Sequence, residues 1–551
     1  MVRPWIVLWF VLSVATYSKA LVRDGSLRDL ALLLNEEKNR ELFQRWTGSM
    51  NDTTAFLSLL EPWIMAIPAA ELPDSTRQRD EVKIDCYSPK YKSLFTGNKL
   101  APNRPRIIVD FVPFGYDVDK LLLRLIETWD SVDVYVIYEM PFTLLGIYKP
   151  LLFPRIREQP RFKEFASKIL YITGSASKES SLGATAEYVR NQTDVYKLKE
   201  AKKRARHHEH NTGNSNLGNT EGHFLPSSLF AMMYKFDSDI IRYFKLLPPV
   251  DQLPEGSDPY LKHSAVLKAR VMDTLSKYGP SSVYGIQNDG DEIMTAHGLA
   301  HVKHCELKPE VVSIYAPCFS FKNNFHWLQR TSDMYSWGKE IRHTNAGGGG
   351  GGEGRTSSSW DMDGKTAWYL DSTRTSLNGF LWKSGPFLWP LNHFLDGNYG
   401  KGSVLRTNFT TNQKNEHHLG YGAAFHMSAV SEPAEVWMKA CGTVENVDVC
   451  WRSISPRLIE AGKKGEITGA VIYDSSIKPW CHLNHPTVHI DSGKLSPAAK
   501  AVIMWSVPRV VKENPEYFPF MYPGKGKGDR MGLFDITALP KWMDECPTRK
   551  G

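Results

Sequence analysis

The chain has 551 residues, of which 42% are apolar and 23% are charged. This usage is ordinary for globular proteins, and the length suits one large domain or two to three average ones. The formal net charge of +7 owes much to local runs such as residues 202–206. Neither a basic stripe interleaved with aromatics nor a recognisable nucleic-acid module is present, so we expect no nucleic-acid partner.

The first 20 residues have the pattern of a signal peptide. Arg3 precedes an apolar stretch from Trp5 to Val14, and the small residues Ser18 and Ala20 stand at the spacing of a cleavage site. The apolar run is shorter than the roughly 20 residues that a spanning helix needs. A short uncleaved signal-anchor, and with it an N-terminal membrane attachment, stays open as the alternative.

Entry into the secretory pathway changes how the seven cysteines are interpreted. In an oxidising lumen some of them should pair, and because the number is odd at least one is free or pairs between chains. Three glycan-acceptor sequons, at Asn51, Asn191 and Asn408, are consistent with a lumenal glycoprotein.

Residues 21–104 form a helical and loop-rich stem by composition, with a helix pattern over Leu27–Leu34. From Arg106 the character changes. The pattern predicts a buried strand over 107–112, a helix over 119–129 with Asp119 as candidate cap, and a strand over 132–138. Strand, helix and strand over about thirty residues predict a βαβ unit and a mainly parallel sheet.

The rest of the chain alternates elements with polar insertions. Residues 174–222 carry the basic run and His207–His210, which we interpret as a solvated loop rather than a metal site. Periodicity then predicts a helix over 263–277 and strands over 283–286 and 311–321. A glycine run at 347–352 predicts a disordered insertion at about 340–360.

The acidic run Asn288–Glu292 directly follows a predicted strand, at the sheet edge where open α/β folds collect ligands. Asp289 and Asp291, with a glycine between them, can turn toward one hard cation such as Mn²⁺ or Mg²⁺. Such a metal would neutralise charge developing on a diphosphate leaving group. Asp-x-Asp is a short motif, which recurs at 361–363, and an exposed turn is the alternative interpretation.

Four blocks of the sequence resemble glycosyltransferase family 17, the bisecting N-acetylglucosaminyltransferase family. The first block, residues 117–153, has Arg124, Glu127, Asp130, Asp133 and Glu139 at family-like spacing. The second, 283–293, is similar to the family's strand ending in Asp-Asp-x-Asp-Glu-Ile. The third and fourth are 424–428, with Lys439 downstream, and 508–520.

The resemblance implies an α/β fold with a GT-A-like nucleotide-sugar-binding domain and a mainly parallel central sheet over about 105–525, followed by a tail over 526–551. It also implies UDP-GlcNAc as donor, a divalent metal, an N-glycan mannose as acceptor in β-1,4 linkage, and a Golgi location. Inversion requires a carboxylate base and a stabilised leaving group.

The resemblance assigns candidate roles to seven residues. Asp289 and Asp291 are expected to hold the metal and diphosphate. Arg270 is a further diphosphate-binding candidate, and His426 and Lys439 are candidates for binding a donor phosphate or the acceptor. Glu292 and Glu139 are candidates for the catalytic base or for donor binding. For several of these a structural role is the alternative: Glu292 as a partner of the next helix N-cap, His426 in a hydrogen bond, and Arg270 on an exposed helix face.

Three residues depart from the family pattern. Asn288 stands where the family usually has its first Asp, and Phe425 and Met427 replace Trp and Cys. The remaining Asp-x-Asp-Glu core predicts activity. The departures motivate two alternatives: a lumenal glycan-binding protein of the same fold without turnover, and a transferase with another UDP-sugar or acceptor.

Overall fold

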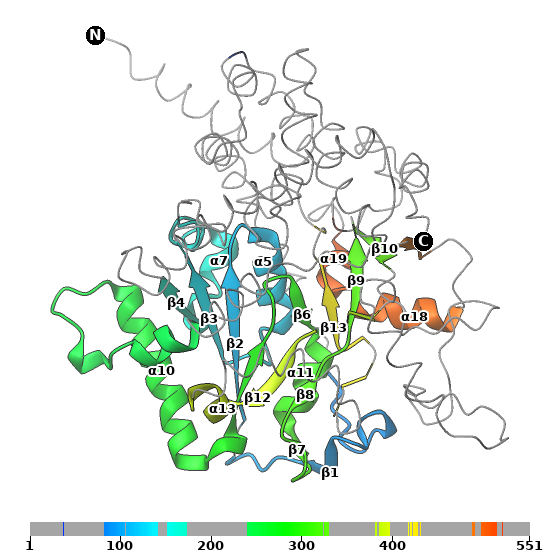
Figure 1. Cartoon of the computed structure of the whole chain (residues 1–551), viewed down its shortest axis with the longest axis horizontal. Coiled ribbons are helices and arrows are strands. Elements are labelled where there is room, and N and C mark those ends of the chain that lie inside the picture. The colour runs from blue at the N-terminus through cyan, green and yellow to red at the C-terminus, as the bar shows by residue number, and fades with distance from the viewer. Residues whose placement is uncertain are drawn as a thin grey trace, which may run out of the picture.

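A computed structural model describes the parts of the chain that position the candidate site (Figure 1). The longer described stretches are residues 82–104, 106–140, 151–173, 240–322, 324–329, 385–396 and 497–514. The shorter ones are residues 37, 381–382, 417, 419–420, 422–427, 430, 487–490 and 521. The expected signal peptide, the helix at 27–34, the sequons, both insertions' low-complexity runs, Lys439 and the C-terminal tail lie outside these residues.

A six-stranded central sheet has the order β4-β3-β2-β5-β12-β8. The first four strands of this order are parallel and the last two pair antiparallel. Their bounds are β2 Ile107–Phe114, β3 Val134–Glu139, β4 Ile169–Thr173, β5 Val283–Gln287, β8 Ile314–Tyr315 and β12 Phe387–Pro390. The predicted βαβ unit and the mixed α/β class with parallel strands are therefore confirmed.

Alternation along β2 explains how this sheet is covered on both faces. Ile108 and Val112 belong to one apolar cluster, which includes the buried face of helix α5 (Val118–Thr128). Val109 and Phe111 belong to the other cluster, together with residues of helix α10 (Pro259–Tyr278). Because successive side chains of a strand point to opposite faces, one continuous apolar strand serves two cores. In Figure 1, α10 lies beside β4 at the left of the sheet.

Two local predictions need correction. The strand expected over 311–321 is two strands, β8 and β9 (Cys318–Lys322), in different sheets. Pro317 lies between them and cannot donate a ladder hydrogen bond, which favours a break there. Helix α5 begins after Asp117 rather than at Asp119, whose carboxylate instead pairs with Arg161 at 3.2 Å.

A second sheet has the order β14-β10-β9-β13-β6, with β11 paired to β9. Its members are β6 Glu292–Met294, β10 Asn324–Gln329, β11 Leu381–Trp382, β13 Ala424–His426 and β14 Thr487–His489, in addition to β9. Strand β5 of the central sheet ends at Gln287, and β6 begins at Glu292. The acidic run is therefore the crossing from one sheet to the other.

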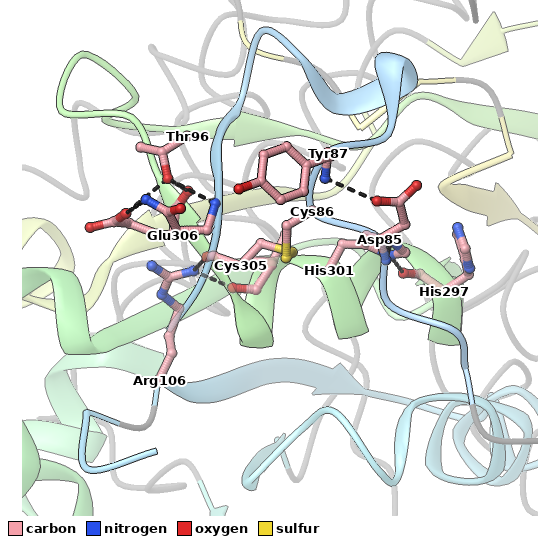
Figure 2. The surroundings of a disulfide bond; sticks show 11 residues. Asp85, Cys86, Tyr87, Thr96, Arg106, His297, His301, Cys305 and Glu306 are labelled. Carbon is pink, nitrogen blue, oxygen red and sulfur yellow. Dashed lines mark hydrogen bonds between the residues drawn. A yellow bond between two sulfur atoms is a disulfide. The ribbon is translucent and has the colours of Figure 1, made fainter. Parts of the chain in front are cut away.

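Residues 82–104, expected as the end of the stem, pack against the domain (Figure 2). Cys86 forms a disulfide with Cys305, 219 residues away, which confirms that some cysteines pair. Strand β1 (Phe95–Lys99) pairs with β7 (Cys305–Leu307), and the Asp85 amide donates to His301 of helix α11 (Ala296–His304). No helix among the described residues is long and apolar enough to cross a bilayer.

Candidate functional site

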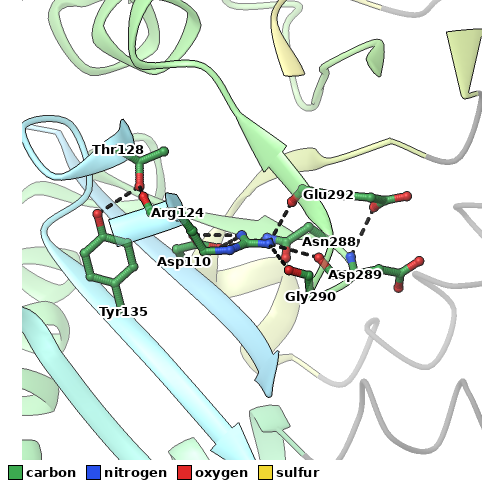
Figure 3. A network of polar contacts seen from close by, with 8 residues as sticks. All are labelled: Asp110, Arg124, Thr128, Tyr135, Asn288, Asp289, Gly290 and Glu292. Atoms are coloured by element: carbon green, nitrogen blue, oxygen red, sulfur yellow. Dashed lines mark hydrogen bonds and ion pairs between the residues drawn. The ribbon is translucent and has the colours of Figure 1, made fainter. Parts of the chain in front are cut away.

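A buried arginine organises the crossing loop between β5 and β6 (Figure 3). Arg124, on α5, is 1% exposed, and its Nη1 donates to both carboxylate oxygens of Asp110 at 3.2 and 3.0 Å. Its Nη2 donates to the carbonyl oxygens of Asp289, Gly290 and Glu292 at 3.0, 3.2 and 2.7 Å. One guanidinium therefore fixes the loop backbone to the central sheet.

The loop also closes on itself and packs tightly on β2. The Asp289 amide donates to the Glu292 carboxylate at 3.1 Å, and the Glu292 amide donates to the Asp289 carbonyl at 3.1 Å. A Cβ added at Gly290 would lie 2.7 Å from the backbone oxygen of Pro113. Only a glycine allows the loop to approach β2 this closely, so the glycine of the Asp-x-Asp run has a steric reason.

Asp291 and His426 lie next to each other where β6 begins and β13 ends. His426 Nε2 lies 3.4 Å from Asp291 Oδ2, and both side chains are nearly buried. The other ring nitrogen of His426, Nδ1, lies 3.2 Å from the Ser320 hydroxyl, which orients the imidazole. The Met427 amide donates to the Asp291 carbonyl at 2.9 Å. The structure thus brings together two candidates that are 135 positions apart in the chain.

The two candidate bases differ in what their carboxylates contact. Glu139 is fully buried and accepts hydrogen bonds from the amides of Leu152 and Phe153, at 2.7 and 3.0 Å, and from the Tyr171 hydroxyl at 3.0 Å. Burial and the adjacent Glu139 carboxylate raise the pKa of the Tyr171 phenol far above its usual range, so the phenol stays a donor. Glu139 therefore holds residues 151–153 against β3.

Glu292, also fully buried, begins β6 and contacts the acidic loop itself through the Asp289 amide. The following helix, α11, is capped by the Thr295 side chain, which accepts from the Gly298 amide at 3.4 Å. The sequence suggested Glu292 as a partner in capping this helix, but the observed capping hydrogen bond is made by Thr295.

The remaining candidates lie apart from the loop or outside the described residues. Arg270 is on the exposed side of α10, whose buried residues, such as Leu267 and Val271, face the sheet. Lys439 lies outside the described residues. Phe425 and Met427, which depart from the family pattern, are both completely buried in the apolar core. Both are therefore core residues.

A divalent cation at this loop would have to share its ligands with a substrate. The described residues include no group of three or more His, Cys, Asp or Glu side chains arranged to hold a metal. Cations that bridge phosphates are commonly held by one or two carboxylates, with substrate oxygens and water completing the shell. Carboxylate oxygens suit Mg²⁺ and Mn²⁺, whereas an imidazole nitrogen is more typical of the softer transition metals.

Comparison with known proteins links part of this architecture to one family. A family model described as glycosyltransferase family 17 matches residues 90–209. The predicted resemblance is confirmed over that segment. The matched segment includes β2, α5, β3 and β4, and with them Asp110, Arg124 and Glu139. The acidic loop and His426 lie outside it.

The relatives of known name are similar to this chain only over a short segment and at low sequence identity. β-1,4-Mannosyl-glycoprotein 4-β-N-acetylglucosaminyltransferases of Rattus norvegicus and Homo sapiens are each 31% identical over 84 residues, and that of Mus musculus is 30% identical over 84 residues. These matches cover 15% of this chain and 16% of each relative. No solved structure matches the chain significantly.

Sequence reasoning missed the polar bracket beneath the loop, formed by Asp110, Arg124 and Asn288. The signal was present: Asp110 interrupts an otherwise apolar strand, and Arg124 interrupts the run Leu121–Ile126 of an apolar helix face. A charge at a fully buried position needs a partner, so two isolated charges of opposite sign in neighbouring elements predict an ion pair.

Proposed function

We propose that the chain is an inverting glycosyltransferase that moves N-acetylglucosamine from UDP-GlcNAc to a mannose of protein N-glycans in β-1,4 linkage. One observation carries the proposal. The acidic loop at the carboxyl edge of the parallel sheet is fixed by Arg124, which belongs to the segment that matches glycosyltransferase family 17. Ligands of open α/β sheets bind at that edge.

In this proposal the fold is GT-A-like and the loop receives the donor's diphosphate through Mn²⁺ or Mg²⁺. Asp289 and Asp291 would hold the cation, and His426, whose Nε2 lies 3.4 Å from Asp291 Oδ2, would bind the same cation or a phosphate oxygen. When bound, the metal neutralises the charge that develops on the leaving UDP. Arg270 and Lys439 stay donor-binding candidates whose placement lends no further support.

An inverting transfer also needs a base that takes the proton of the acceptor hydroxyl as that oxygen attacks the anomeric carbon. Glu139 is committed to two backbone amides and the Tyr171 hydroxyl. Glu292 adjoins the proposed diphosphate site through its bond to the Asp289 amide. These contacts favour Glu292 as the base and Glu139 as a structural carboxylate.

The disulfide supports a location in the secretory pathway, and with the family match a Golgi location. Disulfides persist in oxidising compartments and are rare in the cytosol. Cys86 and Cys305 join segments that lie 219 residues apart, and the pair is buried. The N-terminal segment is proposed to direct the chain there, as a signal peptide or a short anchor.

Donor hydrolysis by the secreted chain tests this function. The protein would be incubated with a panel of UDP-sugars, with Mn²⁺ or with chelator, and the release of UDP followed. We expect turnover of UDP-GlcNAc that chelator abolishes. The double variant Asp289→Ala/Asp291→Ala should be secreted but inactive, and the exposed Asp251→Ala serves as the matched control.

The outcomes separate the alternatives. Turnover confined to another UDP-sugar would keep the mechanism and overturn the donor. Full activity of the double variant would overturn the assignment of Asp289 and Asp291. No turnover of any donor, with or without an N-glycan acceptor, combined with glycan binding that needs no metal, would favour the non-catalytic binding protein.

A further inference from the structure

Arg124 binds the loop although one of its own donor nitrogens is left without a hydrogen bond. Its Nε is buried and has no hydrogen-bond partner among the described residues. Its charge is removed from water with that of Asp110, at 2% and 1% exposure of the two side chains. Buried ion pairs contribute little net stability, because desolvation offsets their attraction. Local rules that a protein breaks in this way are often found at functional sites.

The contacts of Arg124 determine which side of the loop is left for a ligand. The carbonyl oxygens of Asp289, Gly290 and Glu292 turn inward to one guanidinium. Figure 3 shows the carboxylates of Asp289 and Glu292 on the side of the loop away from Arg124. The backbone carbonyls therefore lie on one side of the loop and the two carboxylates on the other, where Asp289 is half-buried and Glu292 fully buried.

A third residue completes the bracket under the loop. The Asn288 side-chain amide donates to Asp110 Oδ1 at 2.8 Å, so Asp110 binds the start of the loop as well as Arg124. The guanidinium also places positive charge beneath three acidic residues that follow one another within four positions. That charge reduces the mutual repulsion of the carboxylates when no cation is bound.

We propose that Arg124 is a positioning residue of the proposed transferase: anchored by Asp110, it holds the 289–292 loop in the conformation that binds the divalent cation. The inference rests on the proposed function and extends it. Arg124 touches neither donor nor metal. It acts through the loop backbone, and a lysine in its place keeps the charge but cannot reach both Asp110 and three carbonyls with a planar fork.

Direct Mn²⁺ binding to the full-length chain tests this role, measured by calorimetry or by electron paramagnetic resonance of the free ion, with UDP present. Arg106→Lys is a matched control. Arg106 is also a buried arginine that donates to three backbone carbonyls, those of Ser281, Val302 and Cys305. These lie away from the acidic loop, near the beginning of β2 and the end of α11.

We expect Arg124→Lys to weaken Mn²⁺ binding about 10- to 100-fold, the range found when the residues that orient metal ligands are changed. Arg106→Lys should leave Mn²⁺ binding within about twofold of the wild type, even if its melting temperature falls as much as that of Arg124→Lys. Hydrogen exchange should show faster exchange of the 289–292 amides in Arg124→Lys alone.

Three results would overturn the inference, and they distinguish the positioning role from the proposed function. A folded Arg124→Lys protein that binds Mn²⁺ like the wild type, or a loss of binding shared equally with Arg106→Lys, would refute the positioning role and leave the proposed function standing. A wild-type chain that binds no Mn²⁺ in the presence of UDP would refute the metal-dependent function, and the positioning role with it.

Discussion

The side-chain amide of Asn288 forms one of the hydrogen bonds in the bracket beneath the loop. Asn288 is 3% exposed, and its Nδ2 lies 2.8 Å from Asp110 Oδ1. The family resemblance suggests Asp at this position as the natural alternative. Asn288→Asp would replace a hydrogen-bond donor by a second buried carboxylate at nearly the same distance from the first.

The size of the penalty follows from that distance. Two unit charges at the 2.8 Å separation repel by about 6 kcal/mol with an effective dielectric of about 20. The variant limits this cost by protonating the new carboxyl, whose ordinary pKa is about 3.9. Keeping it protonated costs about 4 kcal/mol at about pH 7 but only about 1.5 kcal/mol at about pH 5.

The sign of the pH dependence is therefore fixed. The folded-state pKa of the new carboxyl lies above its unfolded value, so its protonated form sustains stability below the unfolded pKa. That contribution is lost as the pH rises through the folded value. We expect Asn288→Asp to be less stable than the wild type at neutral pH, with a gap that narrows on acidification.

Thermal unfolding of both proteins at about pH 5 and about pH 7, at one scan rate, measures this gap. Asn98→Asp is the matched control, since the exposed Asn98 amide also donates to a carboxylate, that of Glu306, at 3.1 Å. In an exposed pair the change should cost about 1 kcal/mol or less. An Asn288→Asp gap that is absent at both pH values, or that widens at the lower one, would refute the reasoning.

Three further predictions follow from single contacts. Reduction of the Cys86–Cys305 disulfide, which closes a separation of 219 residues, should lower the unfolding free energy by about 5 kcal/mol by chain entropy, seen as a lower melting temperature with reductant. Gly290→Ala should clash with the Pro113 carbonyl and weaken Mn²⁺ binding, whereas Gly115→Ala, where a Cβ meets nothing within 4 Å, should not. Glu139→Gln should destabilise the fold by about 1–3 kcal/mol, because its amide group faces backbone donors; an unchanged melting temperature with a large loss of turnover would instead make Glu139 the base.

Strands β2, β3 and β5 of the central sheet were predictable because their signals are local, whereas β4 and β12 were not predicted. The strands at 107–114, 134–139 and 283–287 are short apolar runs, and the helices at 118–128 and 259–278 have helical periodicity. The parallel pairing then follows from the βαβ order. The position of the acidic loop at the sheet edge was predictable for the same reason.

The second sheet was not predictable from local patterns. Its strands are two to six residues long and come from positions between 292 and 489, so each is defined by a distant partner. The pairing of Cys86 with Cys305 has no local signal either. Arg124 shows a third limit, since its side chain binds carbonyl oxygens 165 or more positions away, and backbone acceptors leave no trace in the amino-acid pattern.

The place of β4 in the sheet has an evolutionary consequence. Strand β4 is the outermost strand of the central sheet on its side, and the chain leaves this strand at Thr173 and is next described at Ile240. An insertion between these points therefore follows an edge strand of the sheet, and it does not separate the neighbouring strands β2 and β5. Lineages could therefore lengthen, shorten or replace this connection without shifting the register on which Asp110 and the acidic loop depend.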